Sequence, residues 1–160
     1  MPDAATVVRA LRQIPYGLYV VGSLNEGNQA TIVANWVTQV SFHPPCVAIA
    51  VEGDSKMKEY IESSSLFCVN ILPAGSTTFA KAFLKGAEAM GNLVAGKPFT
   101  PALRGTPFLA EAAAAFECVV TSRLPVGDHI VFIGEVVDAV APKDRGDILT
   151  LRETGWKYSK

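Results

Sequence analysis

The chain has 160 residues, of which 49% are apolar and 18% are charged, and its formal net charge at pH 7 is −1. This composition excludes intrinsic disorder, and the length indicates one domain over residues 1–160 with a core of its own. The lack of a basic stripe argues against nucleic-acid binding, and no apolar run reaches the roughly 18 residues of a membrane span. Residues 1–12 lack the apolar stretch of a secretory signal, so we expect a cytoplasmic protein.

The first third of the chain predicts a short helix followed by three strands. Apolar residues at helical spacing predict the helix over residues 6–14. Strands are expected over 16–24 and 29–42, joined as a hairpin by the turn residues 25–28. Two prolines then interrupt the chain, and the apolar run at 46–51 predicts a buried strand.

The middle of the chain alternates helices with one strand. Asp54 and Ser55 can cap a helix that continues through residue 61. A strand is expected over 66–72 and a helix over 77–84. Residues 86–107 hold many glycines and prolines, which predicts a long loop, and loops of this length are usually functional or act as lids.

The last third predicts a long strand pair. Residues 111–124 are ambiguous, because the alanine run at 112–115 favours a helix while residues 116–121 favour a strand. We interpret this segment as a strand, since a short turn leads from it into the strongly β segment 129–140. Residues 149–158 are expected to be irregular. The whole pattern predicts a mainly β fold with short helices, built as a closed or partly open antiparallel barrel.

Three cysteines and one histidine are the candidates for a disulfide or a metal site. Cys46, Cys68 and Cys118 are odd in number and widely spaced, so they fit neither a disulfide framework nor a zinc pattern. We expect three buried thiols. His43 lies three residues before Cys46, but no second pair of ligands is visible, and we predict no metal site.

The familiar catalytic motifs are missing, and one polar patch remains. The sequence contains no Gly-x-Ser-x-Gly, no Gly-x-Gly-x-x-Gly and no phosphate-binding loop of the Walker kind. Polar residues interrupt the apolar strand at 29–42, among them Asn35 and Thr38, with Trp36 between them. The patch is either a solvent-facing side of the strand or a bulge that offers backbone groups to a ligand, because the alternation is not clean.

Five segments together resemble one known family. They are residues 33–45 (VANWVTQVSFHPP), 67–72 (FCVNIL), 127–129 (GDH), 151–158 (LRETGWKY) and 14–23 (IPYGLYVVGS). In this order and spacing they resemble the flavin reductase-like, FMN-binding split-barrel family. The segment 14–23 is most similar to members that work with rubredoxin-type or diiron electron acceptors.

The resemblance implies a six-stranded antiparallel Greek-key split barrel that forms a homodimer. It implies FMN, or sometimes FAD, bound without a dinucleotide fingerprint. The implied function is an NAD(P)H-dependent flavin reductase that passes a hydride from nicotinamide to flavin N5. If reduced flavin is released, the partner would be a monooxygenase.

Two other functions stay open. An FMN-carrying electron-transfer protein of the flavoredoxin type would supply a rubredoxin, a diiron protein or iron without oxidising NAD(P)H. A ligand-binding module with no redox role is the third possibility.

The resemblance also implies the site residues. His129, after the Gly-Asp turn, would face the flavin and the nicotinamide and is the expected catalytic residue. Ser55 and Lys56 begin the predicted helix and could hold the phosphate. Val33 and Trp36 stand where the family often has threonine and serine. The expected cofactor-binding residues are Val33, Ala34, Asn35, Trp36, Val37, Thr38, Ser41, Ser55 and Lys56.

Three aromatic residues could cover the flavin. They are Phe79, Phe83 and Trp156. On spacing alone such residues belong to the core more often than to a cofactor site, so we assign them no catalytic role.

Overall fold

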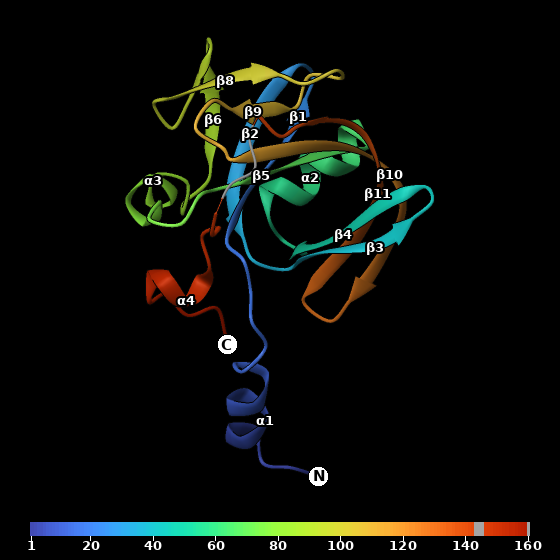
Figure 1. The fold of residues 1–160 in the computed structure, drawn as a ribbon. Helices are drawn as coiled ribbons and strands as arrows, with labels where there is room; N and C mark the ends of the chain where they lie inside the picture. The colour runs from blue at the N-terminus through green and yellow to red at the C-terminus, as the bar shows by residue number, and fades with distance from the viewer. Residues whose placement is uncertain (143–145, 160) are drawn as a thin grey trace.

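A computed structural model describes residues 1–142 and 146–159 (Figure 1). Over these residues the chain is mainly β, as expected, with four short helices. The helices are α1 (Ala4–Leu11), α2 (Lys56–Ser64), α3 (Thr77–Lys81) and α4 (Leu151–Thr154). The strands are β1 (Tyr19–Asn25), β2 (Asn28–Ala34), β3 (Val37–Phe42), β4 (Pro45–Glu52), β5 (Leu66–Ile71), β6 (Ala87–Met90), β7 (Leu93–Val94), β8 (Lys97–Pro101), β9 (Pro107–Leu109), β10 (Ala114–Val126) and β11 (His129–Val140).

All strands pair antiparallel in one continuous sheet. Its order is β3-β4-β11-β10-β5-β1-β2-β6-β7-β8-β9. The described residues therefore form eleven strands and not the six that were expected. The six strands from β4 to β2 form the middle of the sheet, while β3 extends it at one end and β6–β9 extend it at the other.

The long strand expected over residues 29–42 is in fact two strands with different partners. β2 ends at Ala34, which pairs with Tyr19 of β1, and β3 begins at Val37, which pairs with Ile49 of β4. The link between them stays close to β4, because the amide of Ala50 donates to the carbonyl of Trp36 at 3.0 Å. The broken polar pattern thus marks the point where the chain leaves one strand pair and joins another.

The prediction of a long loop over residues 86–107 is also wrong, since this segment contains β6, β7 and β8 and leads directly into β9. Its glycines form tight turns between short strands. Between β7 and β8 the backbone passes through Ala95 and Gly96, with φ of 51° and 73°. Two consecutive residues of positive φ make the two-residue turn that suits the twist of a hairpin.

The loop before β9 is fixed by a buried carboxylate. Glu117 of β10 is fully buried and accepts hydrogen bonds from the amides of Arg104 and Thr106 and from the Thr106 hydroxyl. A buried carboxylate needs such partners, because an unpaired one is very costly. This contact holds the added strands against the central sheet.

Two groups of apolar side chains form the core. One lies between the sheet and α2, where Met57 and Ile61 of the helix are buried. The other includes Phe83, whose ring lies 5.4 Å from that of Phe79. These two phenylalanines pack in the core, as their spacing indicated. Residues 149–158 join the same group through Leu149, and they include the short helix α4 where an irregular segment was expected.

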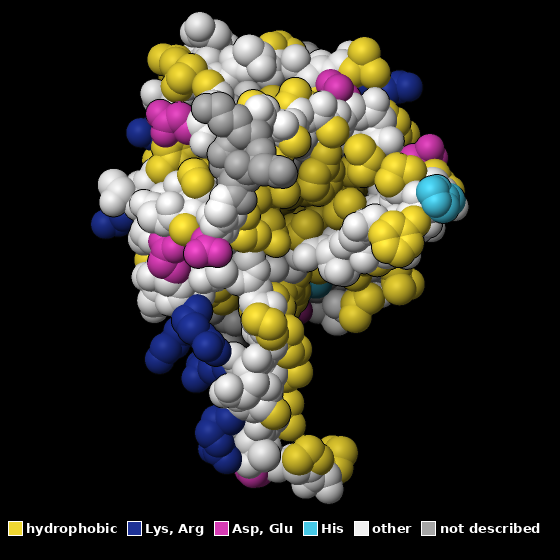
Figure 2. All heavy atoms as spheres, viewed as in Figure 1, with side chains coloured by type: hydrophobic (Ala, Val, Ile, Leu, Met, Phe, Trp, Pro, Cys, Tyr) yellow, Lys and Arg dark blue, Asp and Glu magenta, His cyan; other side chains and the backbone are white. Residues whose placement is uncertain are grey.

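Helix α1 stands clear of the sheet (Figure 1). None of its residues is buried, and Val7, Leu11 and the following Ile14 expose apolar side chains. Figure 2 shows hydrophobic side chains along one side of this helix and Lys or Arg side chains along the other. The helix is therefore amphipathic, but its apolar side has no partner among the described residues.

The remaining expectations concern thiols, metals and membranes. Cys68 and Cys118 are buried, whereas Cys46 is only half-buried, and all three are free. Among the described residues, no three His, Cys, Asp or Glu side chains gather as a metal site. The same part of the chain has no helix that is both long and apolar enough to cross a membrane.

Candidate functional site

A cavity of about 270 Å³ lies where β2 ends. Three of the segments that form its walls carry polar side chains and are far apart in the sequence. Val33, Ala34 and Asn35 come from the end of β2 and the link to β3. Glu52 and Ser55 come from the turn between β4 and α2. The third wall is residues 156–158, which follow α4.

Asn35 brings an unused hydrogen-bond donor to this cavity. Its side chain is only 7% exposed, and its amide nitrogen Nδ2 has no hydrogen-bond partner among the described residues. A buried donor without a partner costs about 1–3 kcal/mol, so native structures rarely keep one without a reason. A ligand with an acceptor atom in the cavity would satisfy it.

A second, more open groove of about 540 Å³ lies on the other side of the link. Trp36, Val37 and Thr38 line it together with Ile14 and other apolar residues. The expected flavin-contacting residues are therefore divided between two hollows, with 33–35 on one and 36–38 on the other. This division follows from the change of strand partner at Asn35 and Trp36.

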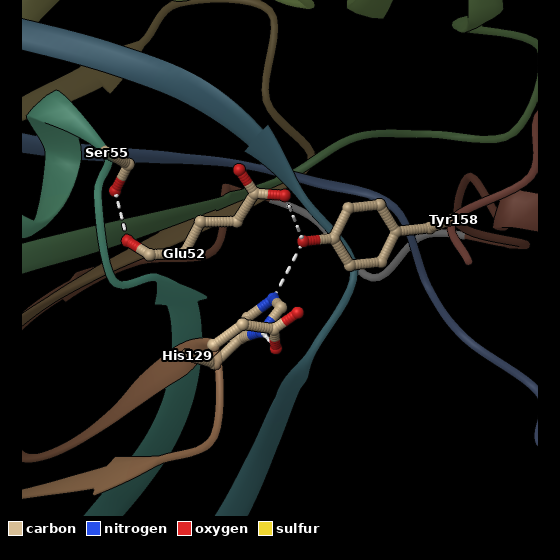
Figure 3. Close-up of polar contacts among 5 residues, drawn as sticks. Glu52, Ser55, His129 and Tyr158 are labelled. Carbon is tan, nitrogen blue, oxygen red and sulfur yellow. Dashed lines mark hydrogen bonds and ion pairs between the residues drawn. The ribbon is translucent and has the colours of Figure 1, made fainter. Parts of the chain in front are cut away.

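His129 is the first residue of β11 and lies opposite Glu52 of β4. Its Nδ1 lies 2.6 Å from a carboxylate oxygen of Asp128, and its Nε2 lies 2.8 Å from the hydroxyl oxygen of Tyr158. The same hydroxyl donates to the Glu52 carboxylate at 3.1 Å. Figure 3 shows the chain of contacts from Glu52 through Tyr158 to His129.

The Asp128 carboxylate fixes the tautomer of His129. A carboxylate can only accept, so a neutral imidazole carries its proton on Nδ1 and offers Nε2 as an acceptor. Burial, the hydrogen bond to Glu52 and the nearby negative charges raise the pKa of Tyr158 well above its usual value, so the phenol keeps its proton. That single proton faces two acceptors, His129 Nε2 and the Glu52 carboxylate.

His129 is covered in this structure. It is 7% exposed, and neither hollow includes it among the described residues that form the walls. The Trp36 ring lies 4.5 Å from the imidazole ring between centroids and 5.1 Å from the ring of Tyr158. The expected catalytic histidine therefore lies beside the cavity, behind Trp36 and Tyr158.

The residues expected at the phosphate end are separated. Ser55 lines the cavity and caps α2, since its hydroxyl accepts from the amide of Lys58 and donates to the carbonyl of Glu52. Lys56 is exposed and forms no part of the cavity wall. Ser41 is half-buried and does not line the cavity either. A different lysine, Lys157, lines the cavity instead.

Sequence reasoning missed Glu52, Lys157 and Tyr158. Glu52 becomes visible only through the register of β4 against β11. The motif at residues 151–158 indicated that this segment matters, but not that it forms a wall of the cavity. Trp156, which was considered a possible cover, lines the cavity and also packs against the second core group.

The fold is an antiparallel β sheet with a cavity at the end of β2. Residues 11–157 match the model of the flavin reductase like domain. The chain therefore belongs to the flavin reductase-like family. Diflavin flavoprotein A 1 of Synechocystis sp. is 31% identical over 139 residues, which cover 86% of this chain and 24% of that protein. The chain thus spans about a quarter of the length of the curated relatives it matches.

Solved structures agree with this membership. NADH:FAD oxidoreductase SgcE6 of Streptomyces globisporus C-1027 superimposes with a TM-score of 0.75 at 28% identity, covering 88% of this chain and 85% of that one. Flavin reductase PheA2 gives 0.76 at 27% identity, with 89% and 90% covered. The styrene monooxygenase flavin reductase of Pseudomonas putida S12 gives 0.72 at 29% identity, with 85% and 86% covered.

Proposed function

We propose that the chain binds FMN in the cavity at the end of β2 and works as an NAD(P)H-dependent flavin reductase. Membership of the flavin reductase-like family and the likeness to an NADH:FAD oxidoreductase support this activity. The observation that carries the proposal is the buried, unpartnered amide of Asn35 in an otherwise mainly apolar cavity.

The residues present fit a flavin. Its ring system is flat and largely apolar, with hydrogen-bond acceptors along one edge, and such ligands favour apolar walls with a few placed polar groups. Val33, Ala34 and Met57 supply apolar wall, and Asn35 supplies the donor. Lys157 offers a positive charge for a phosphate. FAD remains a second candidate, because its flavin ring would make the same contacts.

A bound flavin would supply the redox chemistry by accepting a hydride at N5 from C4 of the nicotinamide. The protein would orient the two ring systems and exclude water from the apolar cavity. Asn35 would bind an acceptor on the flavin edge. Asp128 would hold His129 in the tautomer whose Nε2 can accept a hydrogen bond from the nicotinamide carboxamide.

A second candidate function is electron transfer without NAD(P)H oxidation. It is supported by the relatives called diflavin flavoproteins, of which this chain matches only about a quarter. In that case a rubredoxin, a diiron protein or iron would receive the electrons. If the reduced flavin is instead released, a monooxygenase is the expected partner, and a neighbour named as a styrene monooxygenase flavin reductase supports this.

Steady-state oxidation of NADH and NADPH, with and without added FMN, separates these functions. Flavin-dependent oxidation of either nucleotide supports the reductase. FMN binding without oxidation supports the electron carrier, and a colourless chain that ignores flavin supports a ligand-binding module. We further propose a homodimer and a cytoplasmic location, where reduced nicotinamide is available.

A further inference from the structure

The Tyr158 hydroxyl contacts the one nitrogen of His129 that the nicotinamide would need. The Nε2 acceptor is the free side of the imidazole, because Nδ1 faces Asp128. In this structure the Tyr158 hydroxyl lies 2.8 Å from Nε2. No donor from a ligand can reach Nε2 while the phenol is there. We call this arrangement the closed position of Tyr158.

We propose that Tyr158 controls the access of the nicotinamide to His129, closing the site by its contact with Nε2 and opening it by moving away. This inference rests on the proposed function. It assigns to the segment after α4 a role in co-substrate entry.

The closed position is held weakly enough to open. With a neutral imidazole the phenol has one proton for two acceptors, so it can donate to Nε2 or to Glu52 but not to both. When the proton serves Glu52, the contact with Nε2 contains no proton. A carboxamide N–H that arrives at Nε2 therefore replaces a contact that is only partly satisfied.

The Tyr158 side chain has few anchors besides its ring contacts with Trp36 and His129. Gly155 ends α4 in the left-handed region with φ of 72°, and no regular structure follows it in the described chain. Tyr158 itself is 40% exposed. The next residue, Ser159, accepts a hydrogen bond from Arg12 at the surface, and exposed bonds of this kind contribute little. Tyr158 itself belongs to neither core group, so its side chain can move while Trp156 stays packed.

Closure has a quantitative consequence. A ligand that binds only the open form shows an apparent affinity reduced by the fraction of protein that is open. Removing the Tyr158 hydroxyl removes the closing contact with Nε2 but keeps the ring against Trp36. We therefore expect Tyr158→Phe to lower KM for NADH about 2–13-fold, the range that one hydrogen bond is worth. The FMN dissociation constant is measured alongside, because Tyr158 also lines the proposed FMN cavity.

Glu52→Gln should act in the opposite direction. A neutral amide is a weaker acceptor than a carboxylate, so the phenol proton would turn to His129 and strengthen the closed position. KM for NADH should then rise. Tyr60→Phe is the matched control, because the Tyr60 hydroxyl also donates to a carboxylate, that of Glu88, at 2.6 Å on the surface away from the cavity.

The experiment measures KM and kcat for NADH and the FMN dissociation constant for the wild type and these three variants. A lower KM in Tyr158→Phe, a higher KM in Glu52→Gln and no change in Tyr60→Phe support the inference. A loss of kcat in Tyr158→Phe overturns it and makes Tyr158 a positioning residue for His129. An unchanged KM overturns it as well. If the wild type binds FMN but oxidises no nicotinamide, the proposed reductase function itself fails, and the inference fails with it.

Discussion

The side chain of Asn35 lowers the stability of the empty protein and offers a hydrogen-bond donor to a ligand. Its amide nitrogen is buried and unpartnered, and the residue lines a largely apolar cavity. Folding removes this donor from water without replacing the lost hydrogen bond, so the empty site is less stable than its packing alone would make it. A ligand acceptor would restore that free energy on binding.

Two substitutions at Asn35 test its effects on stability and on FMN binding. Asn35→Leu, similar in volume, should raise the unfolding free energy of the flavin-free protein by about 1 kcal/mol, because it removes the unsatisfied group. Asn35→Asp should weaken FMN binding about tenfold or more, since it loses the donor and adds a negative charge. Urea unfolding and flavin titration measure the two effects. Equal FMN affinity in Asn35→Asp and the wild type would contradict the assignment.

His129 gives the second prediction at this scale. If Nε2 binds the nicotinamide, His129→Ala should slow flavin reduction by about 2–13-fold, which corresponds to one hydrogen bond of about 0.5–1.5 kcal/mol. The affinity for FMN should change little. Stopped-flow reduction of bound FMN by NADH measures the rate directly. Equal rates would show that the histidine has no part in hydride transfer, and weaker FMN binding at an unchanged rate would move it to the cofactor site.

The neighbouring strands β5 and β10 each carry one buried thiol, Cys68 and Cys118. Burial raises the pKa of Cys68 to about 12 and that of Cys118 to about 12, against an ordinary value of 9.0. The neutral thiol is thereby favoured in the folded protein. Cys46, at the start of β4, is half-buried.

These thiols predict both a reactivity and a pH dependence. In the native protein at mildly alkaline pH, only Cys46 should react rapidly with a thiol reagent, and all three should react in denaturant. Because the folded pKa values lie above the unfolded ones, stability is full below pH 9 and falls as the pH rises towards 12. Cys46→Ser should abolish the fast phase. Rapid native labelling of all three thiols would contradict the burial.

Element boundaries show what the sequence can and cannot predict. Residue composition, apolar runs and turn signals predicted β1, β4, β5, β10 and β11, because each is one continuous strand. The prediction failed at residues 29–42, because the uneven polar pattern there did not reveal that the partner strand changes between Ala34 and Val37. It failed again at residues 86–107, where strands of two to five residues are too short to show a period.

In the candidate site, too, local features could be predicted from the sequence and long-range features could not. The motif around Asn35 pointed to the cavity, because its residues are consecutive in the chain. Glu52 and Tyr158 reach His129 only through strand register and the return of the segment after α4, which are long-range features. The cover over His129 could therefore not be predicted from local sequence.

At the scale of the whole molecule, exposed apolar surface supports the proposed homodimer. Val7, Leu11 and Ile14 are exposed near a groove lined by apolar residues, and Phe42 of β3 is 78% exposed. Closed two-fold dimers are the commonest way to cover such surface. We expect α1 to lie in the interface.

Leu11→Gln tests the dimer, with Arg9→Gln on the polar side of α1 as its control. Burying one leucine contributes about 1.5–3 kcal/mol, and two-fold symmetry doubles it to about 3–6 kcal/mol. The dimer dissociation constant should therefore rise at least about a hundredfold in Leu11→Gln and stay unchanged in Arg9→Gln. Light scattering at micromolar concentration measures it. A monomeric wild type would refute the proposal.

The most direct test of the account is anaerobic reduction of the FMN-loaded chain. The purified protein is saturated with FMN, freed of excess flavin by dialysis and mixed with NADH or NADPH while the visible flavin band is recorded. The account predicts one FMN retained per chain and loss of the band with one of the two nucleotides. Flavin that dialyses away from the wild type as readily as from Asn35→Asp, or a band that neither nucleotide bleaches, would contradict it.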